Sequence, residues 1–229
     1  MNSKQILSEL KSHSNKKNRE GMARFGIETK NTLGVSVPVL RKLAKEIGKN
    51  HTLAQELWDS EIHEARMLAC FIDESEKVTK SQINAWAKDF DSWDICDQCC
   101  SSLFDKTSYA WDKAVEFTKR KEEFVRRTGF VLMATLSVHD KKAKDSDFEK
   151  FFPLIKQYAT DERNFVKKAV NWSLRQIGKR NLKLNKRAIA VAKEIQKMDS
   201  KSARWIANDA LRELQSNAVQ ERLKKKKNN

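Results

Sequence analysis

Helix-breaking residues are scarce in this sequence. Its 229 residues include only 2 prolines and 6 glycines, the two residue types that most often end helices or form turns. Leu, Ile, Val, Phe and Trp recur throughout the chain, which excludes a disordered polar sequence. Connections between apolar segments are short and rarely show strand alternation. The sequence therefore predicts an all-α protein.

Long hydrophobic runs are also missing. No apolar stretch approaches the roughly 18 residues that a membrane-spanning helix needs, and residues 1–10 lack the apolar centre of a secretory signal. We therefore expect no membrane partner and a cytoplasmic location with the nucleoid. In that reducing environment the four cysteines are expected to be thiols; they are Cys70, Cys96, Cys99 and Cys100.

The common catalytic motifs are absent. The sequence contains no Gly-rich phosphate-binding loop, no His-Glu-x-x-His and no nucleophile elbow. Cys96-x-x-Cys99 has no second ligand pair to complete a four-ligand metal site. Core packing is the simpler interpretation of these thiols, and we expect neither a metal nor another cofactor.

Positive charge is what the sequence has in excess. The formal net charge is +15, and residues 161–229 carry 19 Lys and Arg against 7 Asp and Glu. Such a field favours a polyanionic partner, and nucleic acid fits better than a membrane surface because no lipidation motif or separate amphipathic anchor is present. The alternative is a basic protein that binds no specific anion.

Apolar residues recur at helical spacing along most of the chain. Gly34-Val-Ser-Val-Pro-Val-Leu-Arg41 predicts a helix that starts near Pro38, with Ser36 as a possible cap, and continues to Ile47. Residues 14–20 form a polar stretch after a first helix over 3–13. Further helices are expected near 52–58, 62–75, 79–89, 93–105, 109–119, 122–137, 147–159, 163–179, 183–197 and 202–218.

A weak internal repeat runs through the second half. Phe124-Val-Arg-Arg127 matches Phe165-Val-Lys-Lys168 at a shift of 41 residues, and Asn171–Arg175 matches Asn208–Arg212 at a shift of 37. Chance similarity between amphipathic helices is the alternative. A repeat of about 40 residues indicates HEAT-like helix pairs stacked into a solenoid with a concave basic surface. We expect one such domain over residues 1–220 and a basic, flexible tail over 221–229.

Two sets of residues are candidates for chemistry. If residues 93–105 form a helix, Trp93 and Asp97 lie on one face, one turn apart. Asp91 or Ser92 can cap this helix and Asp94 falls in its first turn. Spacing alone favours a surface acid paired with a base for Asp97, and core packing is the alternative interpretation of Trp93.

The second set lies on the helix expected over residues 163–179. Lys168, Trp172, Arg175 and Lys179 recur there at three and four residues, and the helix itself supplies too few acids to pair with them. A basic face that contains an indole is typical of a groove that follows phosphates. Core packing remains open for Trp172, and an inter-helix salt bridge for Arg127.

Four motifs in this order resemble a known family. They are Gly34-Val-Ser-x-Pro-x-Leu-Arg41, Ser92-Trp-Asp-x-x-Asp97, Phe124-Val-Arg-Arg127 and Val166-Lys-Lys-Ala-Val-Asn-Trp172 through Arg175. From residue 34 to about residue 180 the chain resembles the AlkD-like DNA alkylation-repair glycosylases. The resemblance implies a HEAT-like fold, a double-stranded DNA substrate with alkylated bases, and excision of cationic N3- or N7-alkylated purines without a cofactor.

The resemblance also implies roles for residues that match the motifs. Asp97 corresponds to the catalytic carboxylate, Trp93 and Trp172 to aromatics beside the lesion, and Arg127 to a residue that holds the DNA backbone. Lys168 and Arg175 are added as DNA contacts from their helix face. Active members of the family can carry an aromatic where this chain has Ser92, which bears on the substrate range.

Three functions are therefore open. The first is an alkylpurine DNA glycosylase that acts as a monomer. The second is a non-catalytic HEAT-like protein that binds damaged or branched DNA. The third is a protein-binding scaffold whose basic face meets an acidic partner. Asp97 with its two tryptophans favours the first, and aromatic residues among Lys and Arg favour DNA over protein.

Overall fold

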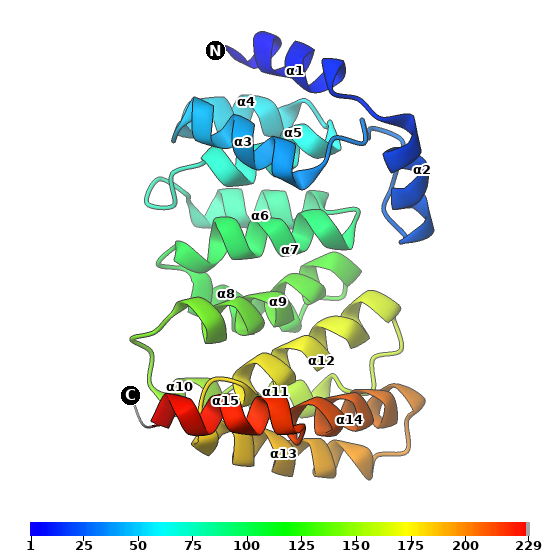
Figure 1. Ribbon diagram of the computed structural model, residues 1–229, viewed down its shortest axis with the longest axis vertical. Coiled ribbons are helices and arrows are strands. Elements are labelled where there is room, and N and C mark those ends of the chain that lie inside the picture. The colour runs from blue at the N-terminus through cyan, green and yellow to red at the C-terminus, as the bar shows by residue number, and fades with distance from the viewer. Residues whose placement is uncertain (228–229) are drawn as a thin grey trace. The chain divides into compact units, whose positions relative to one another are not determined.

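The computed structural model describes residues 1–227 (Figure 1). This part of the chain forms helices and contains no strand, so the all-α prediction is confirmed. None of the described helices is both long and apolar enough to cross a membrane.

The chain divides into two compact units, residues 1–108 and residues 109–229. A helical-repeat array can divide in this way without being two domains, since each repeat packs mainly against its neighbours. The expected single domain over residues 1–220 therefore stays a prediction, and each unit is described by itself.

Seven α-helices and a short 3-10 helix form the N-terminal unit. They are α1 (Ser3–Ser12), α2 (Lys16–Arg24), α3 (Val37–Ile47), α4 (His51–Asp59), α5 (His63–Ile72), α6 (Lys80–Asp89), α7 (Trp93–Ser102) and η1 (Phe104–Lys106). Helix α5 packs against α3, α4 and α7. Helix α3 starts where the sequence predicts, with Ser36 at its N-cap position and Pro38 in its first turn, although the Ser36 side chain forms no capping hydrogen bond.

Helix α2 was not predicted, because its sequence has no apolar stripe. None of its residues is buried. Two local contacts hold its start: the Asn15 side chain accepts a hydrogen bond from the Asn18 N–H at 3.0 Å, and the Asn18 amide donates to the Gly34 carbonyl at 3.0 Å. Gly34 has a φ of +81°, and a Cβ there would lie 2.2 Å from the Asn15 carbonyl oxygen. A side chain at position 34 is therefore excluded by both conformation and space.

Aromatic stacking forms the centre of the N-terminal unit. The rings of Trp58 and Trp86 stack with centroids 3.9 Å apart, and Phe90 and Phe104 pack around them. All four cysteines are buried thiols, as expected for core residues. Burial raises the pKa of the Cys99 and Cys100 thiols well above the ordinary value, which opposes thiolate chemistry.

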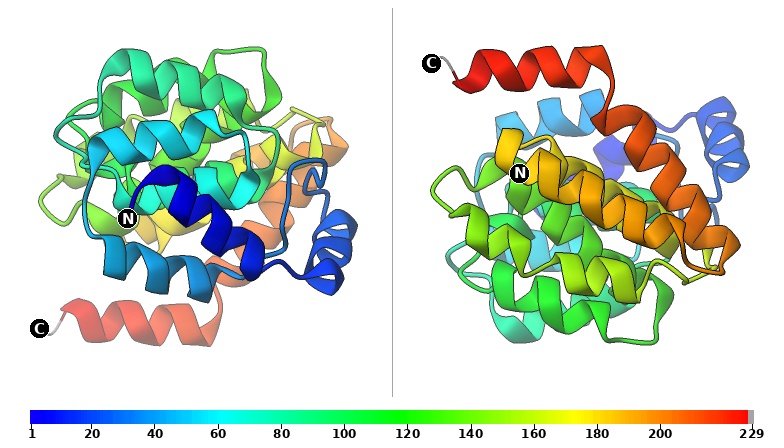
Figure 2. Two further views of the ribbon diagram at one scale, coloured as in Figure 1. Left: turned by 90° about the horizontal axis from the view of Figure 1, so that it is seen from above. Right: turned by 90° about the horizontal axis from the view of Figure 1, so that it is seen from below.

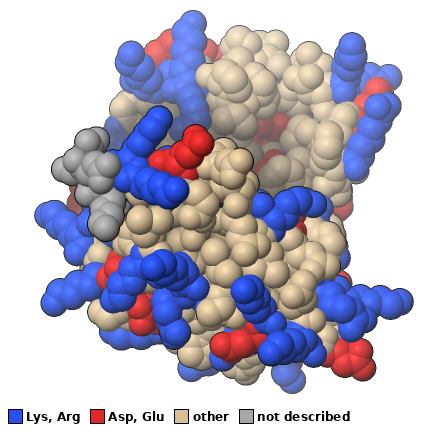
Figure 3. Space-filling model, turned by 60° about the horizontal axis from the view of Figure 1, so that its bottom comes forward, with Lys and Arg blue, Asp and Glu red and all other residues tan. Residues whose placement is uncertain are grey.

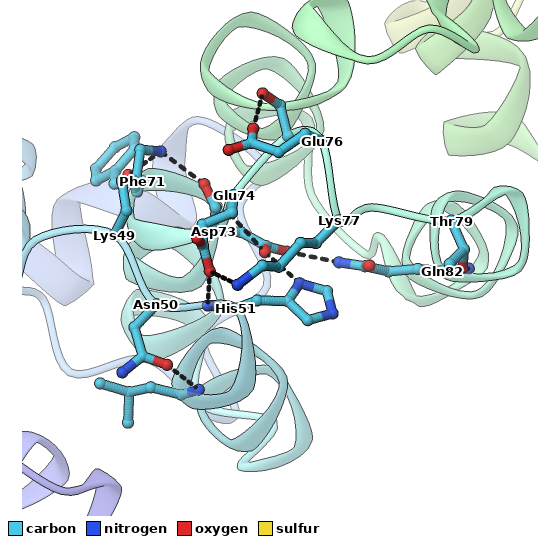
Figure 4. A network of polar contacts seen from close by, with 12 residues as sticks. Lys49, Asn50, His51, Phe71, Asp73, Glu74, Glu76, Lys77, Thr79 and Gln82 are labelled. Carbon is cyan, nitrogen blue, oxygen red and sulfur yellow. Dashed lines mark hydrogen bonds and ion pairs between the residues drawn. The ribbon is translucent and has the colours of Figure 1, made fainter.

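A buried carboxylate joins three helices at one corner of this unit (Figure 4). Asp73 is fully buried and accepts hydrogen bonds from the Gln82 amide at 2.6 Å and the Glu74 N–H at 2.8 Å. Its Oδ1 also lies 2.7 Å from His51 Nδ1. The Lys49 ammonium donates to the Asp73 carbonyl at 2.6 Å. Both Asp73 carboxylate oxygens have protein partners. The role of this histidine–aspartate pair is therefore structural, to hold the helices together.

The C-terminal unit contains α8 to α15. Their bounds are α8 (Ala110–Thr118), α9 (Glu123–His139), α10 (Asp145–Glu149), α11 (Phe152–Gln157), α12 (Asn164–Gly178), α13 (Leu182–Gln196), α14 (Lys201–Leu214) and α15 (Asn217–Lys227). Helices α9 and α12 pack together, as do α13 and α14, which Figure 2 shows side by side.

Two boundaries in this unit differ from the prediction. The helix expected over 147–159 is two short helices, because Pro153 lacks an N–H and fits only the first turn of a helix, here α11. The chain from residue 221 is helical as far as Lys227, and Leu223 is 1% exposed. The flexibility expected of this tail stays a prediction, and its last two residues lie outside the described residues.

The repeat read from the sequence corresponds to real packing. Phe124 on α9 and Phe165 on α12, matched at a shift of 41, contact each other with ring centroids 5.4 Å apart. At the shift of 37, buried Val166, Ala169 and Val170 of α12 correspond to buried Ala203, Ile206 and Ala207 of α14. The matched asparagines differ: Asn171 is buried and donates to the Ile206 carbonyl, whereas Asn208 is exposed.

Gly129 provides a test of how tightly α8 and α9 cross. A Cβ at this position would lie 2.7 Å from the Thr118 backbone nitrogen and 3.0 Å from the Ala114 carbonyl oxygen. We expect Gly129→Ala to lower the free energy of unfolding by about 1–3 kcal/mol, the usual cost of overpacking. Urea unfolding followed by circular dichroism measures this change.

Gly21→Ala is the matched control, because a Cβ at Gly21 in α2 meets nothing within 4 Å. Alanine is the better helix former, so this variant should keep or raise stability by up to about 1 kcal/mol. Equal destabilisation by the two variants would show that the close α8–α9 crossing is not what position 129 requires.

Candidate functional site

Helix α7 presents Trp93 and Asp97 as the sequence predicts. Trp93 is the first residue of the helix and Asp97 lies one turn later; both are partly exposed. The Trp93 indole N–H donates a hydrogen bond to the Phe25 carbonyl at 3.0 Å. This bond fixes one edge of the indole, and Asp97 follows on the same helix face. The pair thus combines a carboxylate and an aromatic ring that ligands can reach.

Ser92 is the N-cap residue of α7, one of the two possibilities that the sequence offers, but its side chain forms no capping hydrogen bond. Its hydroxyl instead accepts a hydrogen bond from the Glu28 N–H at 3.1 Å and donates to Asp91 at 3.0 Å. Ser92 therefore ties the loop after α2 to the start of α7. Asp94 is in the first turn, as expected, but its Oδ2 also lies 2.9 Å from His63 Nε2 on α5.

The His63–Asp94 pair is shielded from water. The side chains are 5% and 14% exposed. Burial lowers the pKa of His63, but the hydrogen bond and charge of Asp94, with smaller contributions from Glu64 and Asp91, raise it above the ordinary value overall. The raised pKa favours the protonated form of His63, in which Nε2–H donates to Asp94. The pair was not predicted from the sequence, because its members are 31 residues apart.

Arg127 lies inside the C-terminal unit. It is 5% exposed, and its Nη1 donates to the Phe165 carbonyl on α12 at 2.6 Å. The residue connects the two helices that carry the repeated Phe-Val-basic-basic motif. Direct contact with a DNA phosphate stays a prediction, and it would need this side chain to turn outward from its present position.

The four residues of the predicted basic face of α12 fall into two pairs that differ in accessibility. Lys168 is exposed and Trp172 partly exposed. Arg175 and Lys179 instead form ion pairs with Glu213 of α14, the latter at 2.6 Å. Burial raises the Glu213 pKa, but its bond to Lys179 and the charge of Arg175 lower it overall.

Arg175 was expected to lack acidic neighbours because its own helix supplies few of them. The acids come instead from a helix nearly 40 residues later. Lys168 and Trp172 therefore remain the more accessible candidates on α12.

An exposed tryptophan on α14 was not among the predicted site residues. Trp205 is 41% exposed, and the Lys167 ammonium lies 5.1 Å from its ring centroid. Lys201, Arg204 and Asn208 are exposed at helical spacing around it. At the shift of 37 residues, Trp205 corresponds to Lys168 of the preceding repeat. Applying the same shift to each candidate residue of α12 would therefore have identified Trp205 as a candidate from the sequence. Lys and Arg are prominent on the face drawn in Figure 3.

The candidate residues belong to two separately described units. Trp93 and Asp97 lie in the N-terminal unit, and the other four lie on α9 and α12 of the C-terminal unit. Within the described residues, no three His, Cys, Asp or Glu side chains are grouped to hold a metal ion.

The His63–Asp94 pair predicts a pH-dependent stability. Because the pKa of His63 is raised in the folded state, its contribution is complete below the unfolded value of 6.5 and disappears as pH rises through the folded pKa. Asp94→Asn should lower the free energy of unfolding by about 1.5–3 kcal/mol at pH 6, as for a hydrogen bond to a charged group, and by less at pH 9. Urea titrations across this range measure the difference.

Replacement of exposed His13 by Gln is the control; a pH-independent effect of Asp94→Asn would contradict the charged pair.

Comparison with known proteins places the whole chain. A search of curated proteins finds no match. One solved structure, described as "a new family of proteins related to the HEAT-like repeat DNA glycosylases with affinity for branched DNA structures", is similar with a TM-score of 0.82 and 20% identity. The match covers 97% of this chain and 96% of the other, and it confirms the HEAT-like fold. The family described as DNA alkylation repair enzyme matches residues 6–214, and the chain therefore belongs to the DNA alkylation repair enzyme family.

Proposed function

We propose that this protein is a DNA repair glycosylase that hydrolyses the N-glycosidic bond of cationic N3- or N7-alkylated purines in duplex DNA. The observation that carries the proposal is the partly exposed edge of α7, where Trp93 and Asp97 lie one turn apart. Membership of the DNA alkylation repair enzyme family supports alkylated DNA as the substrate class.

One carboxylate is enough for this reaction. An alkylated purine such as N7-methylguanine already carries a positive charge, so it leaves without protonation by a general acid, and the usual pair of glycosidase carboxylates is not required. Asp97 would stabilise the positive charge that develops on the sugar and position or deprotonate the attacking water. The Trp93 indole would add a cation–π contact of about 0.5–2 kcal/mol.

DNA binding is proposed for the basic face of the C-terminal unit. Lys168 and Trp172 on α12, with Lys167 and Trp205, combine positive charge with aromatic rings. Phosphates attract the ammonium groups, and the rings offer surfaces on which bases or sugars can pack.

A second candidate function is binding of branched DNA without excision. The similar solved structure is described by its affinity for branched DNA, and Arg127 is directed into the protein rather than toward solvent. Ser92 also stands where active members of the resembled family can carry an aromatic. This function would keep the basic face and dispense with Asp97.

Asp97→Asn separates the two functions. The amide keeps the shape of the side chain but loses the charge that stabilises the sugar cation, so we expect release of N7-methylguanine from duplex DNA to fall about 100-fold or more. Base release is measured by chromatography, and DNA affinity should be unchanged.

Asp91→Asn is the matched control, because Asp91 is an exposed acid beside the same helix; it should retain activity. Equal release by wild type and Asp97→Asn would remove Asp97 from the mechanism. Tight DNA binding by wild type with no release would establish the second function instead.

Salt dependence tests the role of Lys168. Each phosphate that a protein neutralises contributes about −0.9 to the slope of log affinity against log salt for duplex DNA. We expect Lys168→Ser to make this slope shallower by nearly that amount and to weaken binding at low salt. Fluorescence anisotropy with labelled duplex between 50 and 200 mM salt, roughly the range over which such effects are large, gives the slope.

Lys193→Ser is the control for net charge, since Lys193 is exposed on α13. Its slope should stay close to that of wild type. If both variants changed the slope equally, the DNA contact would be spread over the surface rather than placed on α12.

A further inference from the structure

The C-terminal unit presents one indole that the proposed excision chemistry does not use. Trp205 on α14 is exposed, and no other aromatic side chain among the described residues of this unit is as accessible. Its indole N–H donates to no atom of the described residues, whereas the indoles of Trp58, Trp93 and Trp111 each donate one hydrogen bond. An exposed ring with an unused donor is typical of a surface that binds a partner.

The backbone that carries Trp205 is held against α12. The buried Asn171 amide of α12 donates to the carbonyl of Ile206, the residue after the tryptophan, at 3.1 Å. At the start of α14, the Ser202 hydroxyl donates to the Asp161 carbonyl at 2.7 Å. The position of the ring is therefore set before a partner binds, and little backbone ordering opposes binding.

Several cations surround this ring. The Lys167 ammonium lies over it, 5.1 Å from the ring centroid, and Lys201 is exposed one helical turn before Trp205. Neither lysine forms an ion pair within the described part of the chain. Arg204 reaches Asp199 at 3.2 Å, but that carboxylate is fully exposed, so the pair adds little. Charge complementarity therefore points to a polyanion.

The acids of α14 do not cancel this charge. Asp209 lies one turn after Trp205 but pairs with Arg175 and Arg212. Glu213, a turn further, is likewise paired with cations of α12. The cations beside the ring therefore remain available to the phosphates of a ligand.

The internal repeat shows how this position differs from its equivalents. At the shifts of 41 and 37 residues, the same helix positions carry two consecutive cations in α9 and α12 but a cation and an indole in α14. They are Arg126-Arg127, Lys167-Lys168 and Arg204-Trp205. A cation needs only a phosphate, whereas an indole stacks on a base whose face is free. Because bases within a duplex are covered by their neighbours, the ring favours single-stranded DNA at α14.

We propose that Trp205 stacks on an unpaired base of a single-stranded DNA segment that continues from the bound duplex, and that Lys167 and Lys201 bind the phosphates beside that base. The base is already unpaired in the ligand, so no base has to leave a duplex. The proposal rests on the DNA binding of the proposed function but not on excision by Asp97. It makes α14 the place where the protein distinguishes an overhang or flap from continuous duplex.

Three ligands separate stacking from charge. They share one duplex whose end is blunt, carries an overhang of adenine nucleotides, or carries an overhang of equal length made of abasic sites; the overhang is placed on the 5′ or the 3′ strand in separate ligands. The abasic overhang keeps the phosphates but has no base to stack. By fluorescence anisotropy, we expect wild type to bind the adenine overhang at least about 5-fold more tightly than the abasic one for one polarity. Equal affinities for both polarities would overturn the proposal.

Trp205→Leu tests the ring. Leucine is apolar and a good helix former but cannot stack on a base, so the adenine and abasic overhangs should bind this variant equally. Trp205→Phe keeps a smaller ring and should retain part of the preference; circular dichroism establishes that each variant is folded. A full preference in Trp205→Leu would overturn the proposal, and the surface would then serve a partner other than single-stranded DNA.

Lys201→Ser is the matched variant for charge. It should weaken binding of the adenine and abasic overhangs equally and make the slope of log affinity against log salt shallower by about 0.7, the value for one single-strand phosphate. The preference for adenine should stay. Lys193→Ser, on the exposed side of α13, should change neither quantity. A slope that Lys201→Ser leaves unchanged would remove this lysine from the proposed contact.

Two further measurements locate the contact and separate this proposal from the catalytic one. Photocrosslinking from iodouracil in the overhang, followed by mass spectrometry, should attach the strand to Trp205; attachment only to other residues would overturn the proposal. Asp97→Asn should keep the adenine preference while losing base release. If wild type binds blunt duplex and releases N7-methylguanine without preferring the adenine overhang, the α14 proposal alone is wrong. If it binds no DNA, the proposed function fails as well.

Discussion

The buried carboxylate of Glu64 organises the part of the molecule that carries the candidate site. This side chain is 1% exposed, and it accepts three backbone N–H groups from the loop before α3. A loop of this kind would otherwise leave those donors unsatisfied inside the protein. Because Glu64 lies in the first turn of α5, the loop is fixed directly beside the His63–Asp94 pair.

The same loop determines where α2 can lie. Gly34 donates to Glu64 and accepts from Asn18, so one residue connects the buried carboxylate to a helix that buries nothing of its own. Residues after α2 then return to α7 through the Ser92 hydroxyl and the Trp93 indole. The partly exposed edge of α7 is therefore supported at its N-terminal end by residues that lie 64 or more positions earlier in the chain.

Periodicity predicted the helices with buried stripes and the adjacency of Trp93 and Asp97, because both follow from helical spacing alone. It failed for α2, which is held by asparagine side chains and a glycine contact rather than by apolar residues. It also failed to foresee Glu213 beside Arg175 and the inward direction of Arg127. Those features depend on which helices pack together, and one helix read in isolation contains no information about its neighbour's charges.

The way α2 is attached has a consequence for motion. A helix without buried side chains, secured near each end by a few hydrogen bonds, can detach locally while the aromatic centre of its unit stays folded. Amide hydrogens of residues 16–24 would then exchange with solvent through a small opening that leaves α5 and α7 protected. Such an opening removes one wall of the cavity of about 680 Å³ that α2, residues 34–37 and the start of α5 line, so a bulky ligand could enter it without unfolding of the protein.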